Sequence, residues 1–524
     1  MIQERYFKVN NTNMVKKTLL FLLSYLIIEL TMELLCENGN FQPYDRFPST
    51  FFYMKLLYFV KGGLLMERYG ITVELKNKPV LDPDFMPLLK YNEEFLKEAT
   101  KPVSIAVERA DGQMATCHTK IREAADMKDA NNYYVDRLVK TLLWLQGGFR
   151  VYVAGDKDIY EYLKNTYCDG GARAFDYDFM ANIYEHPFEV IWGDTVPEAK
   201  DAPYKAGGNL KGCRIGFDAG GSDRKVSAVI DGETVYSEEV VWYPKITEDP
   251  DYHYNGIVEA FKSAASHMPR VDAVGISSAG IFINNRTMTA SLFLKVPKEL
   301  YEEKVKDIYI RAVKDTFGDV PYMVANDGDV SALAGTMSLK DNNVLGIAMG
   351  TSEAVGYIDE EGRITGWLNE LAFVPVDANP NAMIDEWAGD IGCGVKYFSQ
   401  DAVIKLAPAA GIELNESDAP AQKLKAVQAL MAEDDPRAAK IYESIGCYLG
   451  HTLAYYYQTY GFRYVLMLGR VMSGKGGDLL METCQHVLND EYPEIADKFK
   501  LTLPDEYFRR VGQSMAVASL PECE

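Results

Sequence analysis

The chain has 524 residues, with 54 lysines and arginines against 76 aspartates and glutamates, which gives a net charge of -22 at pH 7. A chain with this negative charge would repel the phosphate backbone of a nucleic acid, and the sequence shows no compensating basic patch. We therefore expect no nucleic-acid partner. A hydrophobic fraction of 48% excludes a disordered chain, and the length predicts two to four domains.

The first 65 residues differ from the rest of the chain. Two lysines precede an apolar run at residues 18–28, in the manner of a signal peptide or weak membrane anchor. The run is short for a membrane span, and Leu35 stands where a cleavage site prefers a small residue. We therefore favour the interpretation that the protein starts at Met66 and that the residues before it are a translated leader. We expect stable membrane contact only if residues 16–36 are a genuine anchor.

Residues 66–212 are predicted to form a small N-terminal α/β domain of unknown role. Residues 101–120 alternate on both sides of Asp111 and Gly112, which indicates a β-hairpin. A helix near residues 134–145, the strand "FRVYVAG" and the helix "DKDIYEYLKNTY" are expected to follow. The stretch "DTVPEAKDAPYKAGGNLKG" is rich in Pro, Gly and charge, which predicts a linker.

The remainder repeats one order of elements, hairpin, helix, strand, helix and strand, in residues 213–340 and again in 341–504. The first pass contains strands at 214–218, 225–231, 234–241 and "VDAVGISS", a helix over 298–317 and the strand "VPYMVAND". The second contains "NVLGIAMG", the hairpin "EAVGYIDEEGRITG", a helix over 437–460, the strand "YVLMLG" and a helix from about Asp478. A helix at about 505–521 is assigned to the first lobe. Two similar halves leave a central cleft, where a ligand is expected.

Two strand ends in the first half carry carboxylates. Asp218 is followed by Gly220, Gly221 and Ser222, a turn whose bare N–H groups suit a phosphate. Asp218 is then an oxygen ligand for magnesium, direct or through water, unless the segment is a simple tight hairpin.

The second acidic cluster is "ANDGDVSALAG", which opens a helix after the strand "PYMV". The helix N-terminus is expected to keep Asp327 ionised, so that it accepts a proton from an attacking hydroxyl. The alternative role for these side chains is to cap the helix. We expect that one of the three residues Asn326, Asp327 and Asp329 serves only as a cap.

Two further turns follow apolar strands in the second half. Gly350, Thr351 and Ser352 offer donors for terminal phosphates. The stretch "LGRVMSGKGG" nearly matches a P-loop, but Gly476 stands where a magnesium-binding Ser or Thr is needed. We interpret it instead as an adenosine-holding turn, with the glycines Gly469, Gly474 and Gly476.

These four turns, in this order, resemble the ROK family of sugar kinases within the actin-like ATPase superfamily, over roughly residues 214–521. "DAGGS" and "MGTSEAVG" resemble the two phosphate motifs, "AND" the motif of the catalytic base, and "LGRVMSGKGG" the adenosine turn. "GWLNELAFVPVD" resembles the motif that makes Glu370 a sugar-hydroxyl ligand, beside Asn326. The resemblance implies ATP and Mg²⁺ as cofactors, Asp327 as the base and duplicated ribonuclease-H-like (actin-like ATPase) lobes, so the fold class is α/β.

The sequence also departs from the family pattern. Phe373 takes the place of a His, and only Cys393 remains of a zinc motif, so no structural zinc is expected. Val395 replaces a sugar-binding Glu, and Glu353 adds a negative charge beside the second phosphate turn. These changes disfavour ordinary glucose phosphorylation, because a lost charge-assisted hydrogen bond and a repulsive carboxylate each weaken binding by roughly 1 to 3 kcal/mol.

Two functions of different classes follow. The first is an ATP-dependent carbohydrate kinase with a small-molecule sugar as partner and a homodimer as a candidate assembly. The second is a non-catalytic sensor that binds a sugar or nucleotide and signals through residues 66–212. A DNA-binding repressor of the same family is disfavoured, because the upstream stretch reads as hairpin and α/β elements rather than a helix-turn-helix.

Overall fold

The computed structural model of the protein describes residues 66–505 and 512–522. The predicted leader at residues 1–65, with its candidate anchor at 16–36, lies outside the described residues, as do residues 506–511 of the predicted last helix. Within the described ranges, no helix combines the length and apolar character that crossing a membrane requires.

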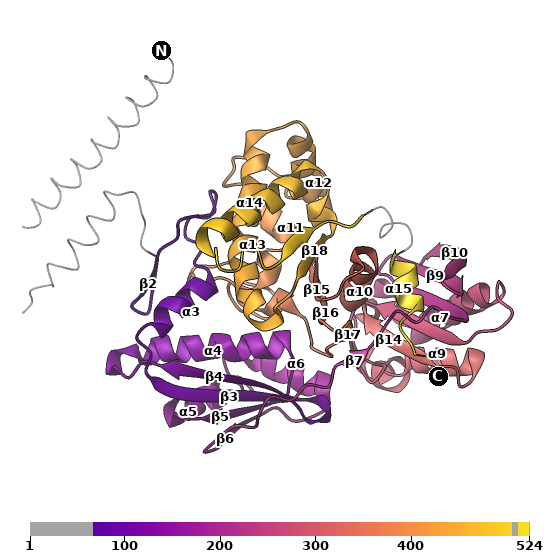
Figure 1. Ribbon diagram of the computed structural model, residues 1–524, viewed down its shortest axis with the longest axis horizontal. Coiled ribbons are helices and arrows are strands. Elements are labelled where there is room, and N and C mark those ends of the chain that lie inside the picture. The colour runs from indigo at the N-terminus through magenta and orange to yellow at the C-terminus, as the bar shows by residue number, and fades with distance from the viewer. Residues whose placement is uncertain (1–65, 506–511, 523–524) are drawn as a thin grey trace, which may run out of the picture. The chain divides into compact units, whose positions relative to one another are not determined.

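The upstream domain is built on a four-stranded sheet of order β4-β3-β5-β6 (Figure 1). Its longest helix, α4, buries Val135, Val139 and Leu143 completely, one residue in every four, as expected for a helix that presents one face to a core. The elements of this part of the chain are β1 (Met66–Arg68), β2 (Ile71–Val73), α3 (Leu88–Leu96), β3 (Lys101–Arg109), β4 (Gln113–Ile121), α4 (Lys128–Leu145), β5 (Arg150–Ala154), α5 (Lys157–Thr166), α6 (Ala174–Tyr184) and β6 (Glu189–Trp192).

The first lobe contains a five-stranded sheet of order β10-β9-β8-β11-β14. Strands β8, β11 and β14 are parallel, while β9 is antiparallel to β8 and β10. The central strand β8 is buried along nearly its whole length, which explains its apolar sequence. The elements are β8 (Cys213–Ala219), β9 (Asp223–Ile230), β10 (Glu233–Val241), α7 (Pro250–Ala265), β11 (Ala273–Ser278), β12 (Ile281–Ile283), β13 (Arg286–Thr289), α8 (Lys298–Leu300), α9 (Ile308–Phe317) and β14 (Tyr322–Asn326).

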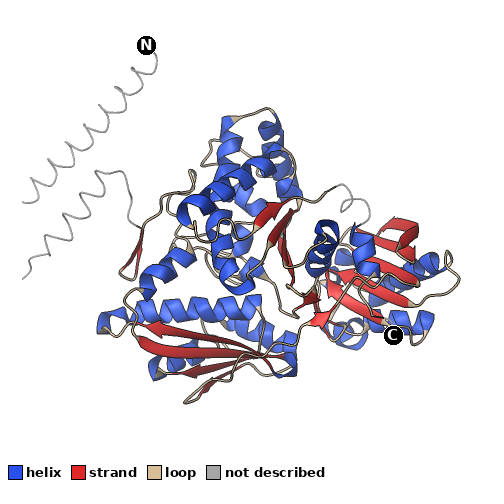
Figure 2. Ribbon diagram, viewed as in Figure 1, coloured by secondary structure: helices blue, strands red, loops and turns tan. Residues whose placement is uncertain are grey.

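The second lobe contains a six-stranded sheet of order β19-β18-β15-β16-β17-β7 with helices packed around it (Figure 2). Its long helix α13 packs against α14, and Gly446 and Gly450 of α13 allow the two backbones to approach closely. The elements are β7 (Tyr204–Lys205), α10 (Asp327–Leu339), β15 (Val344–Met349), β16 (Glu353–Ile358), β17 (Arg363–Ile364), α11 (Gln400–Leu406), α12 (Pro420–Ala432), α13 (Pro436–Tyr460), β18 (Tyr464–Leu468), α14 (Lys475–Glu491) and β19 (Lys500–Thr502). Helix α15 (Gln513–Ala518) packs on β8 and β11 of the first lobe.

The two sheets share one topology. In each, the first strand (β8 or β15) is central. The second and third strands (β9 and β10, or β16 and β17) form an antiparallel meander on one side of it. The fourth and fifth (β11 and β14, or β18 and β19) lie parallel to it on the other side. This is the strand order of ribonuclease-H-like lobes, and it occurs twice. The predicted fold class, duplicated actin-like ATPase lobes with a small upstream α/β domain, is confirmed.

Three predicted elements differ in detail. The segment expected to be a linker contributes β7, which pairs with β17 at the edge of the second sheet, and its Ala206 is buried in that lobe's core. The helix expected over 298–317 is interrupted by a wider turn at 301–305, where the Lys306 N–H donates to the Tyr301 carbonyl at 3.1 Å. Helix α14 begins at Lys475, three residues before the predicted start.

Candidate functional site

The register of the first sheet brings several polar side chains to one edge. Asp218 of β8 lies opposite Ser277 of β11, and Ser278 of β11 lies opposite Asn326 of β14. Because the three strands are parallel, their carboxyl ends meet at the same edge of the sheet, where open α/β sheets bind ligands. The chain separates Asp218 from Asn326 by more than a hundred residues, and only the sheet joins them.

Asp327 is the first residue of α10, directly after β14. Burial raises the pKa of its carboxyl to about 6, helped by the nearby charge of Asp218 and opposed by the Gly328 N–H and by Lys245. The backbone N–H at the helix start lowers the pKa in the direction expected, but burial has the larger effect. The carboxyl still carries its charge at neutral pH, which a proton acceptor needs.

Asp218 shares this environment. It lies at the end of β8, and burial raises the pKa of its carboxyl. The charge of Asp218 acts on the titration of Asp327, so the structure brings the predicted magnesium ligand and the predicted base together. Two carboxyls that are costly to ionise side by side favour a bound cation.

Glu370, the predicted sugar ligand, joins the same group of carboxyls. Burial and the charges of Asp327 and Asp329 raise its pKa to about 7. Its backbone N–H donates to the Trp144 carbonyl at 3.0 Å, so helix α4 of the upstream domain holds the Glu370 segment in place. This support was not predicted, because nothing in the local sequence near Trp144 points to Glu370.

Asn326 has a structural role in addition to its place at the sheet edge. Its side-chain oxygen accepts from the Gly328 N–H at 2.7 Å and so caps α10, while its Nδ2 donates to the Gly280 carbonyl at 2.8 Å. Of the three residues for which capping was the alternative, Asn326 is the N-cap. Asp329, the third, accepts from the Tyr357 N–H at 3.1 Å, and burial raises its pKa to about 7.

The first phosphate turn is held closed by its surroundings. The indole Nε1 of Trp242 donates to the Gly220 carbonyl at 2.8 Å, and the Ser222 hydroxyl donates to Asp223 at 3.0 Å. A Cβ at Gly221 would stand only 2.8 Å from the ammonium nitrogen of Lys245. Glycine at this position therefore lets Lys245 lie directly against the turn.

Lys245 is a functional candidate that the sequence analysis missed. Within residues 66–505 and 512–522, no hydrogen bond or ion pair engages its ammonium group. Its charge also lowers the pKa of Asp327, which places it near the predicted base. A free cation between a glycine turn and a proton acceptor is suited to a phosphate. The sequence "WYPK" gave no signal for this role.

The second phosphate turn, Gly350, Thr351 and Ser352, occupies the corresponding place between β15 and β16 of the second lobe. The Gly350 N–H donates to the Ser352 carbonyl at 3.0 Å, and the Gly350 carbonyl accepts from the Gln400 N–H at 2.9 Å. The turn is thereby tied to the start of α11.

Glu353 follows this turn and is 4% exposed. Neither of its carboxyl oxygens has a hydrogen-bond partner in the described part of the chain, and burial together with the charge of Glu370 raises its pKa well above the ordinary value. Burial without a hydrogen-bond partner disfavours the charged form of this carboxyl. The side chain is buried against Gly394, and its raised pKa disfavours the negative charge from which the repulsion of phosphates was expected.

The glycines of the predicted adenosine turn separate into two groups. Gly469 and Gly474 line a cavity of about 480 Å³, together with Asp478 and Pro504. Gly469 packs so closely against the Met349 carbonyl that a Cβ would stand 2.2 Å from its oxygen, which joins this turn to the second phosphate turn. Gly476 lies outside this cavity's lining, and a Cβ there would overlap the ring of Tyr442.

Phe373, Cys393 and Val395, the residues that depart from the family pattern, make packing contacts or backbone hydrogen bonds. The ring of Phe373 lies 4.2 Å from that of Trp144, centroid to centroid, and Cys393 is fully buried near Asp390. Val395, in the turn after Cys393, accepts a hydrogen bond from the Ser399 hydroxyl through its carbonyl.

The residues present fit a magnesium nucleotide. Magnesium bound with a nucleotide keeps several waters and needs only one or two carboxylates from the protein, a role open to Asp218. Among the described residues no three His, Cys, Asp or Glu side chains converge as a complete metal cage. The glycine turns and Lys245 supply the donors that phosphates require.

No protein-family model matches the chain, and no curated protein is similar to it in sequence. Solved structures that this chain matches include the ROK hexokinase from Thermus thermophilus, 17% identical over 58% of this chain and 97% of that one, with a TM-score of 0.45. A ROK family glucokinase from Streptomyces griseus in complex with glucose and AMPPNP is 18% identical over 59% and 98% of the two chains, with a TM-score of 0.43. A ROK family transcriptional regulator, a homologue of the E. coli MLC protein, is 19% identical over 59% and 78%, with a TM-score of 0.45. The fold assignment itself rests on the strand order of the two sheets.

Proposed function

We propose that the protein transfers the terminal phosphoryl group of ATP to a hydroxyl group of a carbohydrate. The observation that carries this proposal is the state of Asp327: a carboxyl with a pKa of about 6 at the start of α10, beside a second carboxyl and a free lysine. A general base works best when its pKa lies slightly below the working pH, because it is then ionised and still basic.

The roles of the side chains follow from their positions. Asp327 accepts the proton of the attacking hydroxyl at its carboxylate. Glu370 and Asn326 orient the sugar, Asp218 would hold magnesium, and Lys245 binds phosphate oxygens at the first glycine turn. Magnesium ATP, when bound, supplies the phosphoryl group and neutralises part of its charge. Positioning and charge stabilisation make up most of the catalysis in such a transfer.

The test of this proposal is Asp327→Asn, which keeps the shape of the side chain and its capacity to accept from the Gly328 N–H. We expect a melting temperature no lower than that of the parent and a loss of turnover of about 10² to 10⁴, because the proton acceptor is gone. ADP release with purified protein from Met66 onward, measured over a panel of sugars, provides the readout. Asp341→Asn, at a surface ion pair with Arg463, is the matched control and should turn over like the parent. Parent-like turnover of Asp327→Asn on a confirmed substrate would show that the base is misassigned.

Lys245 provides a second test, on the nucleotide side of the reaction. Replacing it by Met removes a charge-assisted hydrogen bond to phosphate, typically worth about 1.5 to 3 kcal/mol. We expect kcat/KM for ATP to fall by about tenfold to a hundredfold, with the affinity for sugar unchanged. Lys262→Met on α7 is the control, and equal kinetics of the two variants would remove Lys245 from the site.

The second candidate function is a non-catalytic sensor of a sugar or nucleotide. It is favoured by the contact between helix α4 and the Glu370 segment, through which a ligand at Glu370 would act on the upstream domain. Calorimetry separates the two functions: sugar binding without ADP release in the presence of magnesium ATP indicates the sensor. A cytoplasmic location and a homodimer stay predictions.

A further inference from the structure

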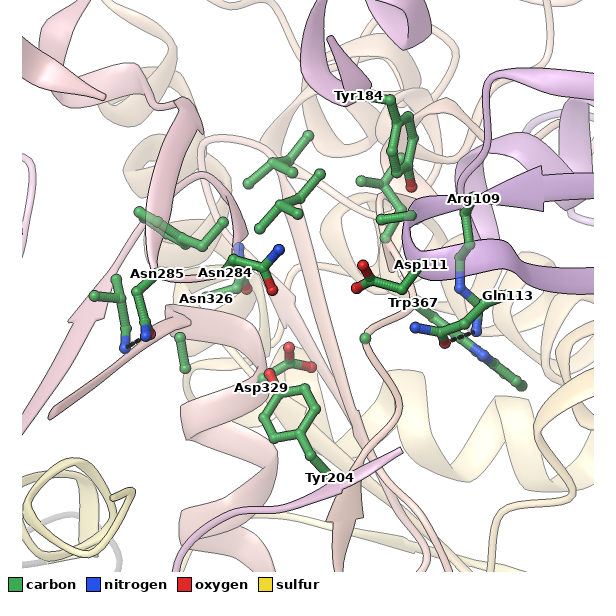
Figure 3. Close-up of a pocket in the computed structure, with 18 of the residues that line it drawn as sticks. Arg109, Asp111, Gln113, Tyr184, Tyr204, Asn284, Asn285, Asn326, Asp329 and Trp367 are labelled. Carbon is green, nitrogen blue, oxygen red and sulfur yellow. Dashed lines mark hydrogen bonds between the residues drawn. The ribbon is translucent and has the colours of Figure 1, made fainter. Parts of the chain in front are cut away.

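A cavity of about 400 Å³ lies where three parts of the described chain meet (Figure 3). The turn between β3 and β4 of the upstream domain forms one wall, and the turn between β12 and β13 of the first lobe forms another. The end of β14 and the start of α10 line the cavity through Asn326 and Asp329. Asn326 directly precedes Asp327, so the cavity begins at the proposed site of phosphoryl transfer and extends to the upstream domain.

Two side chains face one another across this cavity. Asp111, from the upstream hairpin, and Asn284, from the first lobe, point toward one another in Figure 3. Within the described residues no hydrogen-bond or ion-pair partner engages either side chain. Both residues adopt left-handed backbone conformations, with φ of 58° and 52°, and so project from the tips of their turns. A ligand with hydroxyl groups would satisfy both the carboxylate and the amide.

The charge of the lining limits what the cavity binds. Arg109 is 2% exposed and pairs with Asp201, which also accepts from the indole N–H of Trp367 at 3.2 Å. The positive charge of the wall is therefore neutralised within the protein, while the Asp111 carboxylate is left without a counter-ion. An anionic ligand such as a sugar acid or sugar phosphate would be repelled.

The size and chemistry of the wall indicate the rest of the ligand. A volume of about 400 Å³ is within the range of small-molecule pockets, and the aromatic side chains Tyr184, Tyr204 and Trp367 supply apolar faces beside the amides. Aromatic faces combined with amide and carboxylate groups suit a sugar ring, which has apolar faces and a polar rim.

We propose that this cavity binds a second sugar unit of the substrate, so that the upstream domain recognises an uncharged disaccharide or longer saccharide at the end remote from the phosphorylated hydroxyl. This inference rests on the proposed kinase function for the placement of the reacting hydroxyl. It gives the upstream hairpin a direct part in substrate selection.

The test uses glycine substitutions, because glycine is the residue best suited to a left-handed turn. Asp111→Gly and Asn284→Gly remove the two facing side chains without straining the backbone. Asp231→Gly is the matched control, since Asp231 has a φ of 47° in the turn between β9 and β10 and does not line the cavity. An array of neutral and acidic mono-, di- and trisaccharides identifies the ligand, and calorimetry without nucleotide measures its affinity for the parent and each variant.

We expect a neutral di- or trisaccharide to bind at least tenfold more tightly than any monosaccharide. Asp111→Gly and Asn284→Gly should each weaken that binding at least fivefold, while Asp231→Gly stays within twofold of the parent. Retention of monosaccharides or acidic sugars alone, no retention of any sugar, or parent-like affinity of both cavity variants would overturn the inference.

The outcome for the kinase is read separately. Tight saccharide binding that depends on Asp111 but yields no ADP contradicts the kinase and leaves the recognition site standing. Turnover of a di- or trisaccharide that Asp111→Gly does not affect supports the kinase and contradicts the recognition site. Where both hold, Asp111→Gly raises KM for the saccharide and leaves kcat unchanged, because it removes binding common to the ground and transition states.

Discussion

Carboxyl groups in this protein influence one another along a path from Asp218 through Asp327 and Glu370 to Glu353. Each is buried, and the charge of one neighbour raises the pKa of the next: Asp218 acts on Asp327, Asp327 on Glu370, and Glu370 on Glu353. Their pKa values lie above the ordinary range for acids, so the path is only partly ionised at neutral pH. A bound cation would reduce the repulsion between these carboxylates, and a sugar with several hydroxyls would supply the hydrogen bonds that burial denies them.

Asp329 allows the cost of these carboxyls to be measured. Its pKa rises from 3.8 to about 7 on folding, so the folded state holds its proton more tightly than the unfolded state does. Its contribution to stability is complete below pH 3.8 and is lost as the pH rises to about 7. Asp329→Asn resembles the protonated acid and keeps the acceptor for Tyr357. Between pH 5 and pH 8 the parent should lose about 2 to 3 kcal/mol more of its free energy of unfolding than the variant does.

Urea unfolding at the two pH values, without ligand, measures this difference. Asp341→Asn at the surface should show no such difference from the parent. An equal change for parent and Asp329→Asn between pH 5 and pH 8 would mean that Asp329 is ionised throughout.

At the scale of elements, pairs of glycines let helices pack directly on both sheets. Gly216 and Gly275 lie opposite one another on β8 and β11, and α15 rests there: a Cβ at Gly275 would stand 1.7 Å from the Val517 carbonyl oxygen. In the second lobe Gly346 and Gly356 lie opposite one another on β15 and β16 and receive α10. The second pair sets the position of Asp327, because α10 begins with that residue.

The two glycines of the second pair differ in how close α10 comes. A Cβ at Gly356 would stand 2.0 Å from the backbone of Gly328, whereas one at Gly346 would make ordinary contacts of 3.5 Å with Ala332. Gly356→Ala should therefore cost about 2 to 3 kcal/mol and displace Asp327, with a loss of turnover. Gly346→Ala should leave both stability and turnover near the parent values. Thermal melts and ADP release test this pair, and equal behaviour of the two variants would contradict the account of the packing.

At the scale of the whole described chain, the upstream domain is joined to the second lobe through buried charges. Asp390 accepts from Arg137 at 2.8 Å and lies 3.3 Å from the Lys140 ammonium, both on α4, and Arg173 approaches to 2.9 Å. Asp390 is 7% exposed, so water cannot replace these partners. The same helix accepts a hydrogen bond from the Glu370 N–H, and the upstream domain is therefore part of the structure that positions this predicted sugar ligand.

Asp390→Ala tests how strongly the upstream domain depends on this contact. The change leaves buried cations of α4 with fewer counter-ions, which typically costs about 3 to 5 kcal/mol. Asp341→Ala also removes an acidic partner of an arginine, but at the surface, and should leave the stability near that of the parent. Denaturant unfolding and limited proteolysis of the upstream domain give the comparison. Parent-like stability of Asp390→Ala would show that α4 is held by apolar packing alone.

Much of the architecture could be predicted from local sequence, because strand and helix periods and glycine turns are encoded within a few residues of one another. The repeated order of hairpin, helix and strand gave the duplicated lobes, and the turn after β8 gave Asp218 its place. The short strand β7 was missed, because a two-residue strand pairs with a partner about 160 residues away and leaves no periodic pattern.

The sequence by itself therefore determined the lobes, the strand ends and the types of residue that stand there. The tertiary structure decided their chemistry: the raised pKa values of Asp327 and Glu353, the approach of Lys245 to Gly221, and the cavity between Asp111 and Asn284. These properties depend on burial and on contacts between segments that lie far apart along the chain. Such contacts are created only when the sheets form and the upstream domain packs against the second lobe.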